Sequence, residues 1–432
     1  MWTRKGWFYL AVAIVSGLLG LATRSVFLLA LCAFLLTALA VLVFFTRLHK
    51  VVSARLISSE KIFEDGEVEV KLNIVNKGRR TGFLEIRDKL PRQLEITKGT
   101  NYLIVDLKPD EALSMAYTIR APIRGIFEVG PVTMRAQDPF TVFYKELKLD
   151  VIDDLTVFPL VFDIKDIPIR SRAPKLYPGA SKVKQPGPGS EFFLIRDYSP
   201  GDPFKSINWK AYAKTGKLLV NEKEREAVSD IMIIIDARDI SGVGTDGKNA
   251  LLYSTRAAAT LANFFLKRRD SVGLVIYGEK LLMIKQGQGQ KQLFEILTAL
   301  ANAEAKGNLP LKGVIDVGAP YFPKRSPVIV ITSMDEDPTM TKAVSELRTL
   351  SFDVSVISPN SIEFELLARS RIEPGIERAV PYDVLRLERE IMIQDLRGYG
   401  ARVIDWDPKI PLVAALLAAA QQLGGQEYRG GR

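Results

Sequence analysis

Two long uncharged apolar runs stand at the start of this chain, at residues 6–22 and 26–45. A helix rises about 1.5 Å per residue, so roughly 20 residues cross the hydrocarbon core of a bilayer, which is about 30 Å thick. Only three residues separate the two runs. The spacing therefore predicts a two-helix transmembrane hairpin over residues 1–50, which inserts into the lipid bilayer.

The charges around this hairpin predict its direction. Arg4 and Lys5 precede the first run, Arg47 follows the second, and the connecting turn holds only Arg24. By the positive-inside rule, both outer ends face the cytoplasm. A cleaved signal peptide ending near residue 22 is the alternative, and it also leaves the body cytoplasmic because the second run returns the chain. We expect a multi-pass protein of the cell membrane with a cytoplasmic soluble body.

Composition argues against several classes of chemistry. The 432 residues suffice for two or three domains. The only histidine, His49, lies beside the membrane, and the only cysteine, Cys32, lies inside the second apolar run, so no internal disulfide and no histidine- or thiolate-rich metal site is expected. Residues 1–50 supply five of the nine net positive charges. The remaining charge is too thinly spread for a dedicated nucleic-acid binder.

Residues 51–160 alternate apolar and polar side chains, as in Val68, Val70, Leu72 and Ile74. Such period-two alternation is typical of half-buried antiparallel strands. About seven short strands predict an all-β immunoglobulin-like sandwich domain. Because no cysteine pair is present, packing alone is expected to hold the two sheets together.

Two turns of this module are unusually specified, and one of them contains Asp138 and Phe140. We expect Asp138 to cap its turn and Phe140 to fill the core. A binding role for the turn is the alternative.

In residues 227–423, apolar strands alternate regularly with helical segments, which predicts a doubly wound α/β domain with a mostly parallel sheet. The first strand, residues 231–236, ends in Asp236. Ligands of such sheets bind beyond the carboxyl ends of the strands, so Asp236 lies where a site is expected. Residues 424–432 are expected to form a disordered tail.

Residues 161–226 form a linker followed by a segment dense in charges, turns and aromatic residues, which we call the hallmark arm (residues 189–226). Its candidate site residues are Arg196, Asp197, Tyr198, Gly201, Asp202, Trp209 and Lys210. In a structural interpretation, the charged residues form ion pairs that clip the arm to the α/β domain. Trp209 and Tyr198 are then buried anchors, and residues 218–220 add an edge strand. In a functional interpretation, the same side chains form a docking surface, because Trp, Tyr and Arg dominate binding hot spots. Both interpretations stay open.

With this order of elements, the chain resembles the family catalogued as domain of unknown function 58. The residues that carry the resemblance are Glu191-Phe, Arg196-Asp-Tyr198, Pro200-Gly-Asp202, Ile207-Asn-Trp-Lys210 and Lys217-Leu-Leu-Val220. The resemblance implies a divergent von Willebrand factor A-like α/β domain in a membrane-anchored prokaryotic protein. It also implies a MoxR-type AAA+ ATPase as partner, in the assembly or activation of other protein complexes. No catalytic reaction is established for the family, so we expect a non-enzymatic interaction protein.

Von Willebrand A-like domains usually hold a divalent cation with Asp-x-Ser-x-Ser after the first strand, completed by a Thr and an Asp from later loops. Asp236 matches the first position, but Arg238 and Ile240 stand at the serine positions, and Ser333 replaces the later carboxylate. Hard cations need oxygen ligands. Asp236 therefore marks a degenerate metal site, and we expect no cofactor. We expect Asp236 to cap the next turn or to pair with Arg238.

The alternative function is a metal-dependent, adhesion-type protein-binding domain that holds Mg²⁺ at a shifted site. The oxygen donors available near the first strand are Asp239, Ser241, Asp335 and Asp337. The chain has no Gly-x-x-x-x-Gly-Lys-Ser/Thr motif, so any ATP hydrolysis is expected to come from the partner.

Overall fold

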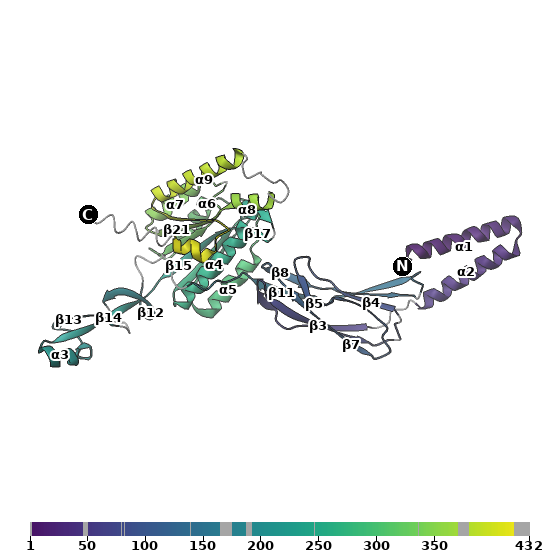
Figure 1. The fold of residues 1–432 in the computed structure, drawn as a ribbon, viewed down its shortest axis with the longest axis horizontal. Coiled ribbons are helices and arrows are strands. Elements are labelled where there is room, and N and C mark those ends of the chain that lie inside the picture. Colours follow the sequence, from purple (N-terminus) through teal and green to yellow (C-terminus); the bar gives the residue numbers. More distant parts are fainter. Residues whose placement is uncertain are drawn as a thin grey trace. The chain divides into compact units, whose positions relative to one another are not determined.

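The computed structural model describes residues 2–45, 51–78, 80–81, 83–138, 140–164, 175–186, 192–245, 247–335, 337–369 and 380–418. The chain divides into two compact units, Met1–Phe158 and Pro159–Arg432 (Figure 1). The predicted tail at 424–432 and His49 lie outside the described residues.

The first unit begins with two antiparallel helices, α1 (Arg4–Thr23) and α2 (Val26–Phe45). Arg24 ends α1 in the left-handed conformation, and its N–H donates to the carbonyl of Gly20. Gly20 packs directly on Leu29, where a Cβ would lie 3.0 Å from the leucine side chain, so the absence of a side chain lets the helices approach. Of the described helices, α1 alone is long and apolar enough to cross a membrane; the described side chains of α2, residues 26–42, make a shorter apolar helix.

Eleven strands follow among the described residues of this unit. One sheet has the order β1 (Val51–Ile57), β3 (Glu67–Asn76), β7 (Ala112–Arg120), β5 (Glu95–Gly99). The second has the order β10 (Tyr144–Leu149), β9 (Val132–Gln137), β4 (Phe83–Asp88), β6 (Tyr102–Val105). A third is β2 (Lys61–Phe63), β11 (Asp153–Phe158), β8 (Gly125–Val129). In β3 the predicted alternation is confirmed over residues 67–74, where the apolar residues are buried in the core and the polar ones are exposed.

A buried ion pair, and not packing alone, connects the two larger sheets. Arg55 of β1 and Asp88 of β4 pair through their side chains, both of which are 0 % exposed. The hydroxyl of Tyr117 on β7 donates to Asp88 Oδ2 at 2.8 Å, and Arg55 Nη1 donates to the carbonyls of Val129 and Val151. The expectation of packing alone is therefore wrong. The sequence pattern did not predict this pair, because Arg55 and Asp88 are far apart in the chain.

The turn around Asp138 holds the start of α1. Its carboxylate accepts from the N–H groups of Phe140 and Phe143, so the predicted cap is confirmed. Phe140 is 69 % exposed, so the expectation that it fills the core is wrong. The chain reverses direction at residue 141, and Phe143 is buried instead. The rings of Phe143 and Trp2 meet edge-on, with their centroids 4.6 Å apart.

The second unit contains a six-stranded sheet with the order β19 (Leu281–Gly287), β18 (Ser271–Tyr277), β15 (Asp230–Asp236), β20 (Pro327–Ile331), β21 (Asp353–Pro359), β22 (Arg402–Trp406). All neighbours are parallel except β18 and β19. The four strands β15, β18, β20 and β21 are almost wholly buried, as their continuous apolar runs predict.

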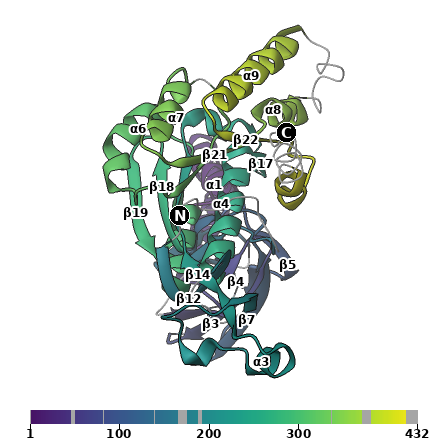
Figure 2. The ribbon, with the colours of Figure 1, turned by 90° about the vertical axis from the view of Figure 1, so that its left-hand side faces the viewer.

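Helices cover both faces of this sheet (Figure 2). On one face α6 (Leu311–Gly318), α7 (Met340–Thr349) and α9 (Val380–Gly398) pack into one apolar core with the strands. The other face carries α4 (Ala250–Lys267) and α5 (Gly289–Asn302), and α8 (Ser361–Arg369) follows β21. The chain leaves β15 toward β18 and later returns to β20 on its other side, so the strand order reverses beside Asp236. This is the place where doubly wound sheets bind ligands.

The hallmark arm and the linker before it form a three-stranded antiparallel sheet with the order β12 (Lys175–Pro186), β14 (Leu219–Val228), β13 (Phe192–Asp197). The short helix α3 (Trp209–Thr215) lies between β13 and β14 in the chain, and Asn208 caps it by accepting from the N–H of Ala211. Residues 219–220 thus pair with β13 and not with the large sheet, which corrects the expected edge strand.

Candidate functional site

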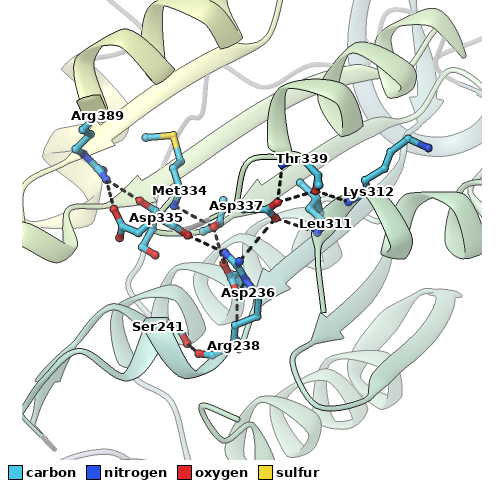
Figure 3. Close-up of polar contacts among 12 residues, drawn as sticks. Asp236, Arg238, Ser241, Leu311, Lys312, Met334, Asp335, Asp337, Thr339 and Arg389 are labelled. Atoms are coloured by element: carbon cyan, nitrogen blue, oxygen red, sulfur yellow. Dashed lines mark hydrogen bonds and ion pairs between the residues drawn. The ribbon is translucent and has the colours of Figure 1, made fainter. Parts of the chain in front are cut away.

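The carboxylate of Asp236, at the end of β15, is 0 % exposed and accepts several hydrogen bonds (Figure 3). Arg238 donates to Oδ1 from its backbone N–H and from Nε, both at 3.0 Å, and to Oδ2 from Nη2 at 2.7 Å. Thr332, directly after β20, donates its hydroxyl to Oδ2 at 2.7 Å. The predicted turn cap and the predicted pairing with Arg238 both occur.

The guanidinium of Arg238 is buried and bridges two loops of the sheet edge. Besides Asp236, its Nη2 donates to the carbonyl of Asp335 at 3.1 Å, and Nη1 lies 3.8 Å from Asp337 Oδ2. Burial by itself lowers the pKa of Arg238, but the hydrogen bond and the charge of Asp236 outweigh it and raise that pKa above its ordinary value. Arg238 is therefore a permanent internal cation at the carboxyl edge of the sheet.

Three of the four other oxygen-bearing residues near Asp236 already make hydrogen bonds. Ser241 donates its hydroxyl to the carbonyl of Arg238 at 2.7 Å, and Asp239 accepts from the N–H of Gly307. Asp337 accepts from the N–H of Leu311 and from the N–H and hydroxyl of Thr339. Over the described ranges, no group of three or more His, Cys, Asp or Glu side chains could hold a metal ion. This donor set does not fit a divalent cation, because a guanidinium fills the centre of it.

A second buried cation, Arg389, comes from α9 and was missed in the sequence. Its Nη1 donates to the carbonyl of Ser333 at 2.6 Å, and its Nη2 donates to the Ser358 hydroxyl and to Asp405, each at 2.7 Å. Helical spacing could have indicated its burial, because Arg389 is four residues before Ile393 and lies on the same buried face of α9. Arg389 thus joins α9 to the ends of β20, β21 and β22.

Arg389 lines a cavity of about 460 Å³, which we call the sheet-edge pocket. Its lining residues are Ile240, Val243, Met334, Asp335, Asp337, Pro338, Ser361, Ile362, Glu365, Leu385, Glu388, Arg389 and Met392. The walls come from the loop after β15, the loop after β20, α8 and α9. The pocket therefore occupies the position that the strand order predicts for a ligand.

Asp335 is the least satisfied group of the pocket. Its Oδ2 atom is buried and has no hydrogen-bond partner among the described residues, and its Oδ1 lies 4.0 Å from Arg389 Nη1. Burial raises the pKa of this carboxyl above its ordinary value. Hydrogen bonding by Ser361 and the charge of Arg389 lower the pKa, but burial outweighs them.

We expect the substitution Asp335→Asn to raise the thermal unfolding temperature at neutral pH. With a raised pKa, the folded state holds a proton that the unfolded state has already lost, so stability falls as pH rises between the two pKa values. Asparagine imitates the neutral form and removes this loss. The gain should shrink in acid and vanish below the ordinary carboxyl pKa of about 3.9. Melting curves of both proteins across pH test this, and a lower unfolding temperature of the variant at neutral pH contradicts it.

In the hallmark arm, one ion pair closes a tight loop. Arg196 donates from Nη1 and Nη2 to the two oxygens of Asp202, both at 2.7 Å, and the N–H of Ser199 donates to the same carboxylate. The hydrogen bond from Arg196 lowers the pKa of Asp202 to about 2. Gly201 completes the loop with φ 111°, a conformation that favours glycine. The pair ties β13 to its own following loop, and the expected clip to the α/β domain is not what it forms.

The aromatic residues of the arm face outward. Trp209 is 58 % exposed and Phe204 is 74 % exposed, so the expectation of Trp209 as a buried anchor is wrong. Tyr198 is half-buried, and Asp197 and Lys210 are exposed. The ring of Tyr212 meets Trp209 edge-on, with centroids 6.2 Å apart, so the aromatic residues form a patch on α3.

Fold and site together define a protein with an N-terminal pair of apolar helices, a β-sandwich unit and an α/β unit whose sheet edge carries a pocket and internal ion pairs. Residues 194–364 match the family described as "Protein of unknown function DUF58", which confirms the predicted family assignment over that segment. This match begins within β13 and extends through the α/β unit into the first half of α8.

One curated relative is the "Uncharacterized protein YeaD" of Bacillus subtilis (strain 168), 22% identical over 66% of this chain and 67% of the relative. Among solved structures, a FixG-related protein from Vibrio parahaemolyticus is 13% identical over 26% of this chain and 98% of its own, with a TM-score of 0.18. The CARDB domain of the PF1109 protein from Pyrococcus furiosus is 15% identical over 26% of this chain and 97% of its own, with a TM-score of 0.17. At such TM-scores these two likenesses support no functional argument.

Proposed function

We propose that this protein is a membrane-anchored, non-enzymatic adaptor of the cell membrane. In this proposal it works with a MoxR-type AAA+ ATPase in the assembly or activation of protein complexes, and its α/β unit is a divergent von Willebrand A-like recognition body. The observation that carries the proposal is the buried Asp236–Arg238 pair. Arg238 places an internal cation at the edge of the sheet where ligands of such folds bind. In this proposal the surface at that edge recognises a protein partner, and no bound metal takes part.

Membrane anchoring is supported by the surface of the helix pair. Apolar side chains of α1 and α2, among them Trp7, Leu18 and Phe27, point outward and are well exposed. In water such a surface is costly, whereas in lipid it is the stable arrangement. We propose that both helices span the bilayer, so that the protein is multi-pass and its two soluble parts lie in the cytoplasm.

Docking through the hallmark arm is supported by the exposed patch on and beside α3. Phe204, Trp209 and Tyr212 are exposed next to Lys205 and Lys210. Large exposed aromatic side chains flanked by charges are typical of binding hot spots. In this proposal the Arg196–Asp202 loop positions the patch, and the arm has the docking role.

Capture from detergent-solubilised membranes tests this proposal, with the full-length protein as bait and mass spectrometry as readout. We expect an AAA+ ATPase in the wild-type capture and a loss of about 30-fold in affinity with Trp209→Ala, since a hot-spot truncation costs about 2 kcal/mol. Stability should change by less than about 0.5 kcal/mol, because the side chain is exposed.

Tyr321→Ala is the matched control, because this aromatic residue is equally exposed but lies outside the arm. It should capture the ATPase as the wild type does. A wild-type capture without any AAA+ ATPase overturns the proposed partner, and full retention by Trp209→Ala overturns the docking role of the arm.

A further inference from the structure

We propose that the sheet-edge pocket receives a basic side chain, lysine or arginine, from a protein partner. This inference rests on the proposed function, because it takes the bound molecule to be a protein. It deepens that function by naming the chemistry that the α/β unit recognises.

The charge of the pocket favours a cation. Its lining holds four carboxylates, from Asp335, Asp337, Glu365 and Glu388, against one guanidinium, that of Arg389. Arg389 already donates hydrogen bonds to Asp405, Ser333 and Ser358. Carboxylates outnumber cations in this lining, which disfavours acidic partners.

Three of the four carboxylates already lie beside internal cations, since Asp335 Oδ1 is 4.0 Å from Arg389 Nη1. Asp337 lies beside Arg238, and Glu365 pairs with Arg369 at 2.9 Å, one helical turn away on α8. The fourth, Glu388, is exposed on α9, and Asp335, on the loop after β20, keeps its second oxygen without a hydrogen-bond partner among the described residues. A bound cation that reaches both carboxylates would be held by the loop and by the helix.

The buried Oδ2 of Asp335 is the second, independent indication. It has no hydrogen-bond partner among the described residues, although buried polar atoms are nearly always paired. An N–H donor brought in by a ligand would supply the missing bond. Arg389, at 4.0 Å from the other oxygen of Asp335, is too far away to provide it.

The rest of the lining fits the carbon stem of such a side chain. Met334, Leu385 and Met392 contribute apolar walls. Lysine and arginine characteristically bury their methylene groups along apolar surface and keep the charged end on polar groups. A volume of about 460 Å³ lies at the small end of ligand pockets, which suits one long side chain with its local backbone and not a folded segment.

Methyl NMR of the full-length protein in detergent micelles tests the inference, because Met334 and Met392 line the pocket and report on its occupant. The probe is N-acetylarginine methylamide, and the neutral isostere N-acetylcitrulline methylamide is its matched control. Methyl signals are assigned with Met334→Leu and Met392→Leu. We expect the arginine probe to shift both methyl signals in the millimolar range, and the citrulline probe to leave them in place.

Glu388→Gln should weaken the arginine-dependent shift at least fivefold, and because Glu388 is exposed this variant folds normally. Equal shifts with citrulline, no shift with arginine, or displacement of arginine by Mg²⁺ overturns the inference. The NMR result and the capture result can be told apart. If Trp209→Ala loses ATPase capture but the pocket does not respond to the arginine probe, only the inference about the pocket is overturned. Arginine binding without any ATPase capture removes the proposed partner and leaves the pocket chemistry intact.

Discussion

Replacing Arg238 by alanine is expected to destabilise the α/β unit by about 3–5 kcal/mol, because it leaves the fully buried carboxylate of Asp236 without its cation. For a unit of this size, each kcal/mol lowers the unfolding temperature by about 2–4 °C, so a decrease of roughly 10 °C is expected. Trp406 lies buried in β22 of the same unit, so the transition can be followed by tryptophan fluorescence.

The double variant Asp236→Asn/Arg238→Met distinguishes loss of the ion pair from general damage to the core as the cause of destabilisation. Removing both charges should recover most of the loss, because the cost arises from a single uncompensated charge. Lys267→Ala is the matched control; its pair with Asp163 is exposed, so its effect should stay below about 1 kcal/mol. A decrease for Arg238→Ala no larger than that of the control would contradict the buried pair.

The second large effect is expected in the β-sandwich. Arg55→Met leaves Asp88 buried and removes the donors to the carbonyls of Val129 and Val151, so we expect a loss of about 3–5 kcal/mol. Because the pair connects two sheets, the loss should appear as faster amide hydrogen exchange in both β3 and β4. Exchange followed by mass spectrometry reports on this unit separately from the α/β unit.

Arg120→Ala is the control for this experiment, since its pair with Asp65 lies on the surface of the same unit. It should change exchange in the core strands by no more than the equivalent of about 1 kcal/mol. If Arg55→Met accelerates exchange only at β1, the pair does not hold the sheets together, and this part of the account is wrong.

Local patterns in the sequence predicted the faces of the elements well. The alternation in β3 and the apolar run of β15 are buried as expected, and Asp236 pairs with Arg238, its neighbour two residues on. These features depend on residues close together in the chain, where period and spacing determine which side chains meet.

Long-range partners could not be predicted in this way. Arg55 reaches Asp88 across two sheets, and Arg389 reaches the ends of three strands from a distant helix. Trp209 was expected to be buried because large aromatic side chains usually are, yet it lies on a short helix of the arm that covers no core. Burial of a single side chain depends on the tertiary fold, which period and spacing do not specify.

The guanidinium of Arg238 occupies the carboxyl edge of the sheet beside Asp236, so we expect no divalent cation to bind there. Titration calorimetry of Mg²⁺ into the full-length protein and into its Asp236→Asn variant tests this expectation. We expect heats equal to those of dilution for both proteins. Stoichiometric Mg²⁺ binding by the wild type that is lost in the variant would contradict it.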